Sequence, residues 1–199
     1  MPQSVHRRSA MVVAVGSILL AACAPGKPKF NSIDLTGAEY ARDFALKDAT
    51  GKKRTLADFR GQAVAVFFGF TQCPDVCPTT LAEMSQVKKL LGADGERLVV
   101  VFITVDPQRD TPEVVRASMS NFDPAFVALV PTESELADVA KEFKIFYRKV
   151  PGRTETSYVM EHTAASYLFD PQGRLRLYTR YGMGVKPLAD DVRHLLRDS

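Results

Sequence analysis

Residues 64–77 read Val-Ala-Val-Phe-Phe-Gly-Phe-Thr-Gln-Cys-Pro-Asp-Val-Cys, and the rest of the chain is best understood from them. The first seven, Val64–Phe70, carry no polar side chain, which predicts a central strand buried on both faces. Cys73 and Cys77 follow at the junction with a helix that we expect from Pro78. A pair of thiols at such a junction indicates redox or metal chemistry, because each use needs two sulfur atoms brought together.

Strands and helices alternate along the rest of the chain. An apolar strand is predicted at Leu98–Val105 and a short one at Phe126–Val130. Capping residues at Thr111 and Thr132 indicate that helices begin directly after them. The remaining predicted elements are a short hairpin between Phe44 and Leu56, a second hairpin of Ala165–Phe169 and Leu175–Thr179 around the turn Asp170–Gly173, and a last helix from Pro187.

This order predicts an α/β fold in which a central mixed sheet is flanked by helices on both faces. The closing hairpin adds antiparallel strands to a sheet that is otherwise parallel. With a thiol pair after the first long strand, the arrangement resembles the thioredoxin fold. The length of 199 residues suits about one domain, and the 46% apolar and 25% charged residues are typical of a globular protein.

The charge of the chain argues against nucleic acid as a partner. The net charge is +3, and Arg7 and Arg8, with no acid in residues 1–22, leave +1 for residues 23–199. Nucleic-acid binding usually requires a concentrated basic patch, which this small excess does not provide.

The N-terminal residues have the features of a secretion signal. Two arginines precede an apolar run at Ala10–Leu20, which is short for a membrane span but typical of a signal peptide. The run ends in Leu-Ala-Ala-Cys23, which resembles the bacterial lipobox, where the signal is cut before a cysteine that then receives a lipid. An uncleaved N-terminal anchor is the alternative interpretation. Either way, we expect the domain outside the cytoplasm.

These features predict three segments. Residues 1–22 are a lipoprotein-type signal peptide, residues 23–33 are the lipidated Cys23 and a tether, and residues 34–199 are the folded domain. The expected location is therefore the periplasmic side of a bacterial membrane, held by a lipid anchor. In that oxidising compartment the two remaining cysteines, Cys73 and Cys77, can form a disulfide.

The donor inventory of the mature chain favours copper over zinc. A structural zinc site needs four ligands, whereas the mature chain supplies two cysteines, His162 and His194. Two soft thiolates suit Cu(I), which accepts two or three ligands. His162 precedes the predicted hairpin strand, and in a thioredoxin fold that loop faces the cysteine loop. We therefore expect copper, as Cu(I) or Cu(II), on Cys73, Cys77 and His162.

Three motifs in order resemble the Sco/SenC family of copper-binding proteins that assist assembly of cytochrome c oxidase. They are Phe-Thr-Gln-Cys-Pro-Asp-Val-Cys-Pro at 70–78, Thr-Val-Asp-Pro-Gln-Arg-Asp-Thr-Pro at 104–112, and His162-Thr163. The resemblance runs from about Asp34 to Leu196. It implies copper on Cys73, Cys77 and His162, and delivery to, or thiol reduction of, the binuclear copper site of oxidase subunit II or another copper-accepting protein.

Three carboxylates are candidates for supporting roles. Asp106 ends the second long strand, where sites in α/β folds cluster, although loop duty is an equal alternative. Asp75 lies inside the thiol loop as a turn, docking or supporting residue. Glu161 stands where many family members have Asp, which moves the carboxylate by about one methylene group.

Two functions remain open from the sequence. The first is a metallochaperone that binds copper and passes it to a partner. The second is an enzyme, a thiol–disulfide oxidoreductase in which Cys73 attacks a partner disulfide and Cys77 resolves the mixed disulfide. A peroxidase is disfavoured because the Pro-x-x-x-Thr-x-x-Cys pattern is absent around Cys73. A purely structural disulfide is the plainest alternative.

Overall fold

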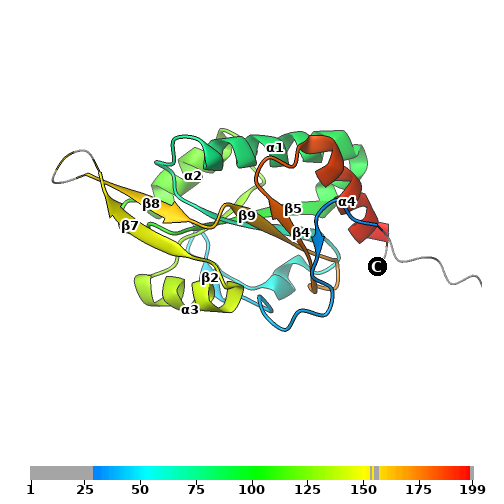
Figure 1. Ribbon diagram of the computed structural model, residues 1–199, viewed down its shortest axis with the longest axis horizontal. Helices are drawn as coiled ribbons and strands as arrows, with labels where there is room; N and C mark the ends of the chain where they lie inside the picture. Colours follow the sequence, from blue (N-terminus) through cyan, green and yellow to red (C-terminus); the bar gives the residue numbers. More distant parts are fainter. Residues whose placement is uncertain (1–28, 153, 155–156, 198–199) are drawn as a thin grey trace, which may run out of the picture.

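The computed structural model describes residues 29–152, 154 and 157–197, and a six-stranded mixed sheet forms its centre (Figure 1). The strand order is β1-β10-β9-β4-β5-β6. Strands β4, β5 and β6 are parallel, whereas β9 is antiparallel to β4, and β10 pairs antiparallel with both β9 and β1. The predicted mixed α/β sheet is confirmed. Its strands are β1 (Ile33–Asp34), β4 (Ala63–Gly69), β5 (Leu98–Thr104), β6 (Val127–Leu129), β9 (Ala165–Phe169) and β10 (Leu175–Arg180).

Helices cover both faces of this sheet. Figure 1 shows α1 and α4 on one side of the strands and α3 on the other. The early hairpin that the sequence predicts is also present, as β2 and β3 followed by a short 3₁₀ turn. The remaining elements are α1 (Val76–Leu91), α2 (Pro112–Ser120), α3 (Glu133–Phe143), α4 (Val185–Arg197), β2 (Leu46–Lys47), β3 (Lys53–Arg54) and the 3₁₀ turns Leu56–Phe59 and Gly92–Arg97.

Strand β4 is the centre of the hydrophobic core, and all seven of its residues are buried. Side chains alternate between the faces of a strand, so its two adjacent phenylalanines serve opposite layers. The Phe67 ring lies 6.0 Å from that of Phe102, and the Phe68 ring lies 5.3 Å from that of Phe143 in α3. The continuous apolar sequence of β4 is therefore explained by helices on both sides of the sheet.

Two helices begin earlier than their prolines suggest. We expected helices from Pro78 and from Pro187, but α1 begins at Val76 and α4 at Val185. Proline is tolerated throughout the first turn, because the N–H groups there have no partner within the helix. The consequence for α1 is functional, since Cys77 lies inside the first turn of the helix and not in the loop before it.

A hairpin that the sequence did not predict projects beyond the ends of the sheet strands (Figure 1). Its strands β7 (Tyr147–Pro151) and β8 (Tyr158–His162) pair antiparallel, with Tyr147 opposite His162. In β8, Met160 is buried and His162 half-buried, whereas Glu161 between them is exposed. The inner face of β8 therefore turns His162 toward the body of the molecule.

The fold includes residues that the sequence assigned to the tether, 23–33. The fully buried carboxylate of Asp191 accepts hydrogen bonds from the backbone N–H groups of Asn31 (2.7 Å) and Ser32 (2.8 Å). The predicted signal peptide and Cys23 lie outside the described residues. Over residues 29–152, 154 and 157–197, no helix has both the length and the apolar character needed to cross a bilayer.

Candidate metal centre

The loop after β4 coils so that its two cysteines face one another. The N–H of Cys73 donates to the carbonyl of Phe70 (3.2 Å), which closes a turn directly after the strand. The N–H of Cys77, in the first turn of α1, then donates to the sulfur of Cys73 (3.4 Å). Three intervening residues are thus enough to bring the second sulfur back beside the first.

His162 joins the two sulfurs from the end of β8. Its Nε2 lies 3.6 Å from Cys77 Sγ, and its Nδ1 lies 3.1 Å from the carbonyl oxygen of Thr163. A carbonyl only accepts hydrogen bonds, so Nδ1 carries the proton and donates it. Nε2 consequently keeps its lone pair, which is the tautomer a metal ligand requires.

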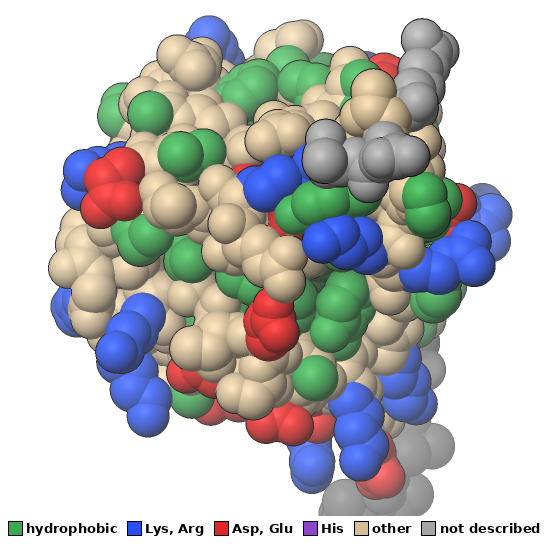
Figure 2. Space-filling view, turned by 90° about the vertical axis from the view of Figure 1, so that its left-hand side faces the viewer, with side chains coloured by type: hydrophobic (Ala, Val, Ile, Leu, Met, Phe, Trp, Pro, Cys, Tyr) green, Lys and Arg blue, Asp and Glu red, His purple; other side chains and the backbone are tan. Residues whose placement is uncertain are grey.

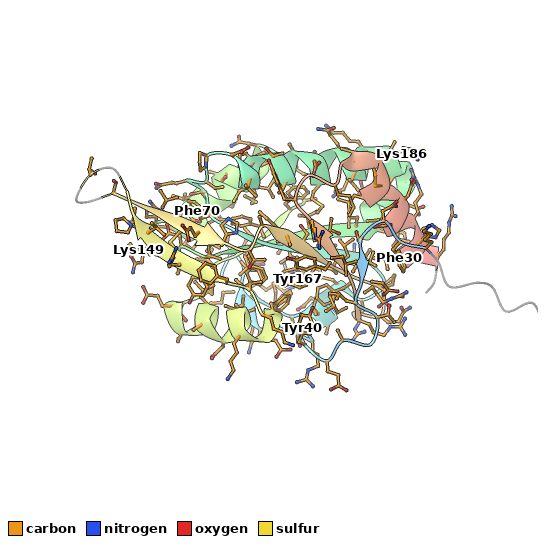
Figure 3. All side chains as sticks on the ribbon, in the orientation of Figure 1. Phe30, Tyr40, Phe70, Lys149, Tyr167 and Lys186 are labelled. Carbon is orange, nitrogen blue, oxygen red and sulfur yellow. The ribbon has the colours of Figure 1, made fainter. Side chains whose placement is uncertain are left out.

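Aromatic side chains surround the imidazole. The rings of Phe67 and Phe70 lie edge-on to it, with centroids at 6.2 Å and 5.9 Å. Figure 3 shows Phe70 beside the hairpin that carries His162. The apolar rings limit the positions open to the imidazole and hold its Nε2 toward the sulfurs.

The three donors form one compact group. The sulfurs of Cys73 and Cys77 and a ring nitrogen of His162 all lie within 4.8 Å of one another. In the described part of the chain, no other group of three Cys, His, Asp or Glu side chains is as close. Two thiolates and one imidazole form a soft donor set that suits Cu(I) or Zn(II) over hard cations.

The two thiols differ in exposure and in acidity. Cys77 is 2% exposed, whereas Cys73 and His162 are half-buried. A hydrogen bond from the Cys77 thiol, together with backbone N–H groups at the start of α1, holds the pKa of Cys73 well below its usual range. Donating that bond, together with burial, raises the pKa of Cys77. Both thiols are free, so the predicted Cys73–Cys77 disulfide would be the oxidised state of this pair.

Gly69 makes room for the buried thiol. A Cβ atom at this position would lie 2.8 Å from Cys77 Sγ and 2.9 Å from ring atoms of Phe67 and Phe102. Both rings are packed in the core and cannot give way easily. Glycine at the end of β4 is therefore required for the sulfur to lie against the strand.

The predicted supporting carboxylates differ in their burial and in the residues that they contact. Asp106 is buried and accepts a hydrogen bond from the Tyr158 hydroxyl (2.9 Å), at the start of the strand that carries His162. Asp75 is the residue before α1, and its Oδ1 lies 3.5 Å from the Tyr181 hydroxyl oxygen. Glu161 lies on the exposed face of β8, away from the imidazole.

Glu161 pairs with Arg148 on the exposed face of the hairpin, and these two residues are directly opposite in the strand register. The Nδ1 atom of His162 lies against the Thr163 carbonyl and not against Glu161. Successive side chains of a strand point to opposite faces, which separates Glu161 from the metal group. A supporting role for Glu161 stays a prediction without a contact behind it.

Arg109 connects three parts of the site, a role that the sequence did not reveal. Its guanidinium donates to Asp106, to the side chain of Gln72 (3.1 Å) and to the carbonyl of Tyr158 (3.0 Å). It also lies 3.6 Å above the Tyr158 ring. Arg109 therefore ties the residue before Cys73 to the strand of His162. The one sequence feature that pointed to Arg109 is its place between two aspartates in the motif at residues 104–112.

The comparisons with known proteins agree on one family. The SCO1/SenC family model matches residues 34–197. A SCO2-like protein of Rickettsia prowazekii is 35% identical over 186 residues, which cover 90% of each chain. The structure of Bradyrhizobium japonicum ScoI with copper bound is 37% identical and superposes with a TM-score of 0.70 over 77% of this chain and 97% of that one.

The apo form of Sco1 from Thermus thermophilus is 33% identical, with a TM-score of 0.75 over 85% of this chain and 99% of that one. Both the strand order and the superposition on a solved Sco structure confirm the predicted thioredoxin-like fold. A family match that spans nearly the whole described chain agrees with the Cys-Cys-His group found at its centre. The chain belongs to the SCO1/SenC family.

Proposed function

We propose that this protein is a copper-binding assembly factor for cytochrome c oxidase. Copper is its cargo, held by Cys73, Cys77 and His162 and delivered to the binuclear copper site of subunit II or to another copper-accepting protein. The observation that carries the proposal is the convergence of two thiols and one imidazole nitrogen within 4.8 Å. Copper in the related ScoI and the description of Sco proteins as cytochrome c oxidase assembly proteins support it.

The buried ligand and the two half-buried ligands have different roles in holding and releasing copper. Cys77, buried against β4, supplies the ligand that stays fixed. Cys73 and His162 are half-buried, so an incoming partner ligand reaches them first. Copper(I) accepts two or three ligands, which allows partner thiolates to replace these donors one at a time. The unprotonated Nε2 needs no proton transfer before it binds or leaves.

A second function, thiol–disulfide oxidoreductase, is favoured by the contrast between the two thiols. Cys73 is the more exposed and the more acidic, as an attacking thiol should be, and Cys77 is buried beside it. The Cys73 thiolate would attack a partner disulfide and form a mixed disulfide. Cys77 would lose its proton and attack Cys73, releasing the partner as a dithiol and leaving a Cys73–Cys77 disulfide.

The proposed location is the periplasmic side of a bacterial membrane, with Cys23 carrying the lipid. This proposal is supported by the sequence of residues 1–23 alone, which lie outside the described part of the chain. The described fold begins near residue 30, where Asp191 holds Asn31 and Ser32. A lipid on Cys23 would therefore leave only a short tether between membrane and domain.

A transfer assay separates the two functions. The reduced chain, loaded with one equivalent of copper, is mixed with the soluble copper domain of oxidase subunit II in its reduced and in its disulfide form. Movement of copper to the reduced acceptor supports the chaperone. The other outcome is that the copper-free chain reduces the acceptor disulfide while no copper moves to the reduced acceptor. That outcome would favour the oxidoreductase over the chaperone.

A further inference from the structure

Two exposed aromatic side chains flank the segment that carries the metal-binding histidine. The described part of the chain exposes six large hydrophobic side chains. Two of them, Phe146 and Tyr181, have backbone groups bonded to the two residues that follow His162. The other four are Ile33, Leu90, Val114 and Val159.

Phe146 borders this segment on the side of the hairpin. Its carbonyl accepts from the N–H of Thr163 (2.9 Å), and its own N–H donates to the Thr163 hydroxyl (2.9 Å). These two bonds fix the backbone of Phe146 next to the residue after His162. The side chain nevertheless remains 55% exposed, the largest value among the six. A phenyl ring held in this way in water is unusual unless something covers it.

Tyr181 borders the same segment and also touches the cysteine loop. Its N–H donates to the carbonyl of Ala164 (3.3 Å), and its hydroxyl lies 3.5 Å from Asp75 Oδ1, between the two cysteines in the sequence. The side chain is 41% exposed. The backbones of the two aromatic residues thus bond to residues 163 and 164, and the Tyr181 side chain reaches the thiol loop.

The arginine beside Phe146 is compensated by a carboxylate. Arg148 lies 5.9 Å from the Phe146 ring centroid and is paired with Glu161. Figure 2 views the end of the molecule that carries the hairpin, and hydrophobic side chains appear there between basic and acidic ones. This ion pair therefore adds no net charge beside the Phe146 ring.

We propose that Phe146 and Tyr181 form a docking surface for the protein that accepts copper from Cys73, Cys77 and His162, and that the acceptor contacts it with an apolar surface. The proposal rests on the proposed function and adds the contact that function needs. Ligand exchange requires the acceptor's ligands to come next to the half-buried donors. Aromatic side chains supply large contact areas at low entropic cost and are enriched where protein interfaces are strongest.

The test measures binding and copper transfer separately. The probe is the soluble copper domain of oxidase subunit II, and the variants are made in the full mature chain in detergent. Phe146→Ser and Tyr181→Ser remove the rings, Tyr181→Phe keeps the ring without its hydroxyl, and Leu90→Ser removes a 46%-exposed side chain on α1 as the matched control. A small Cu(I) chelator serves as a second acceptor that needs no docking surface.

We expect each serine variant to weaken binding to the acceptor domain and to slow subsaturating transfer by about tenfold, as for interface anchors. Transfer to the chelator should be unchanged, and Leu90→Ser should match the unmodified chain. Tyr181→Phe, which keeps the ring, should retain more binding than Tyr181→Ser. Because the contact is apolar, the dissociation constant should change less than about threefold between ~50 and ~300 mM salt.

Three results would overturn the docking surface. The first is unchanged binding to the acceptor domain when Phe146→Ser and Tyr181→Ser are combined. The second is copper transfer to the chelator that is slowed as much as transfer to the acceptor. The third is a steep loss of affinity for the acceptor as the salt concentration rises. Failure of the proposed function has a different signature, since the unmodified chain would then bind the acceptor without releasing copper to it. In that case the dissociation constants of the variants still decide the docking surface. If the unmodified chain does not bind the acceptor at all, both proposals fall.

Discussion

Substitution of Gly69 by alanine tests whether the buried sulfur is fixed by the end of β4. The new Cβ would lie 2.8–2.9 Å from the Cys77 sulfur and from two core phenyl rings. Optimal carbon contacts are ~3.5–4.0 Å, so the sulfur has to move by about 0.7 Å. That displacement exceeds the ~0.2 Å tolerance of metal–ligand distances, and we expect the copper affinity to fall at least about tenfold.

The same substitution also destabilises the fold, which a matched control removes from the comparison. Overpacking a core costs ~1–3 kcal/mol, or roughly 4–8 °C in Tm for 2 kcal/mol in a chain of this size. Gly61, just before β4, has φ +85°, and a Cβ atom there would meet no other atom within 4 Å. Alanine at Gly61 therefore costs a similar ~1–2 kcal/mol through backbone strain alone. Gly61→Ala should lower Tm and leave the copper affinity unchanged.

The assay is competition for Cu(I) against a chelator of known affinity, with Tm measured on the same samples. The expected result is a fall in Tm for both variants and a fall in copper affinity for Gly69→Ala alone. Equal copper affinity in Gly69→Ala and the unmodified chain would refute the argument that Gly69 fixes the position of Cys77. A loss of affinity in Gly61→Ala as well would attribute the effect to stability.

Three further predictions concern Arg109, Cys73 and Cys23. Arg109→Lys keeps the positive charge but cannot make the bonds of the guanidinium to Gln72 and Tyr158 together. The His162-dependent Cu(II) spectrum should therefore weaken, while the Cu(I) stoichiometry stays the same. An unchanged spectrum would contradict a positioning role for Arg109. In the reduced copper-free chain, the alkylation rate of Cys73 should be nearly independent of pH between about 5 and 8, because its lowered pKa keeps it a thiolate. The alkylation rate of an ordinary thiol rises about tenfold per pH unit over the same range. Cys23→Ser should abolish acylation and release the chain from membranes, as measured by mass spectrometry and fractionation; retention in the membrane would favour an uncleaved anchor.

The parts of the fold that the sequence predicts well are those with strong local signals. Strand β4 is recognisable because it needs apolar side chains on both faces, and α3 because Thr132 and Glu135 form a capping box that the structure contains. The β7–β8 hairpin has no such signal. Its strand β7 includes Arg148, Lys149 and Pro151, all exposed, and so lacks the run of apolar residues that marks a strand such as β4.

The metal group was predictable in composition but not in detail. Cys73, Cys77 and His162 follow from donor chemistry and from the family's motifs, and they lie together in the structure. The role of Arg109 depends on contacts with residues 37 and 49 positions away, which no spacing rule reveals. A supporting role for Glu161 stays a prediction, and its neighbour in sequence, His162, lies on the opposite face of the same strand.

Copper loading of the reduced chain, beside His162→Ala, tests the central claim most directly. The quantities to measure are the stoichiometry and the thiolate-to-Cu(II) charge-transfer band. The account predicts one equivalent of copper and a band that His162→Ala abolishes or shifts, while Cu(I) persists on the two thiolates. Absence of stoichiometric binding would contradict the copper site and leave Cys73 and Cys77 as a redox pair.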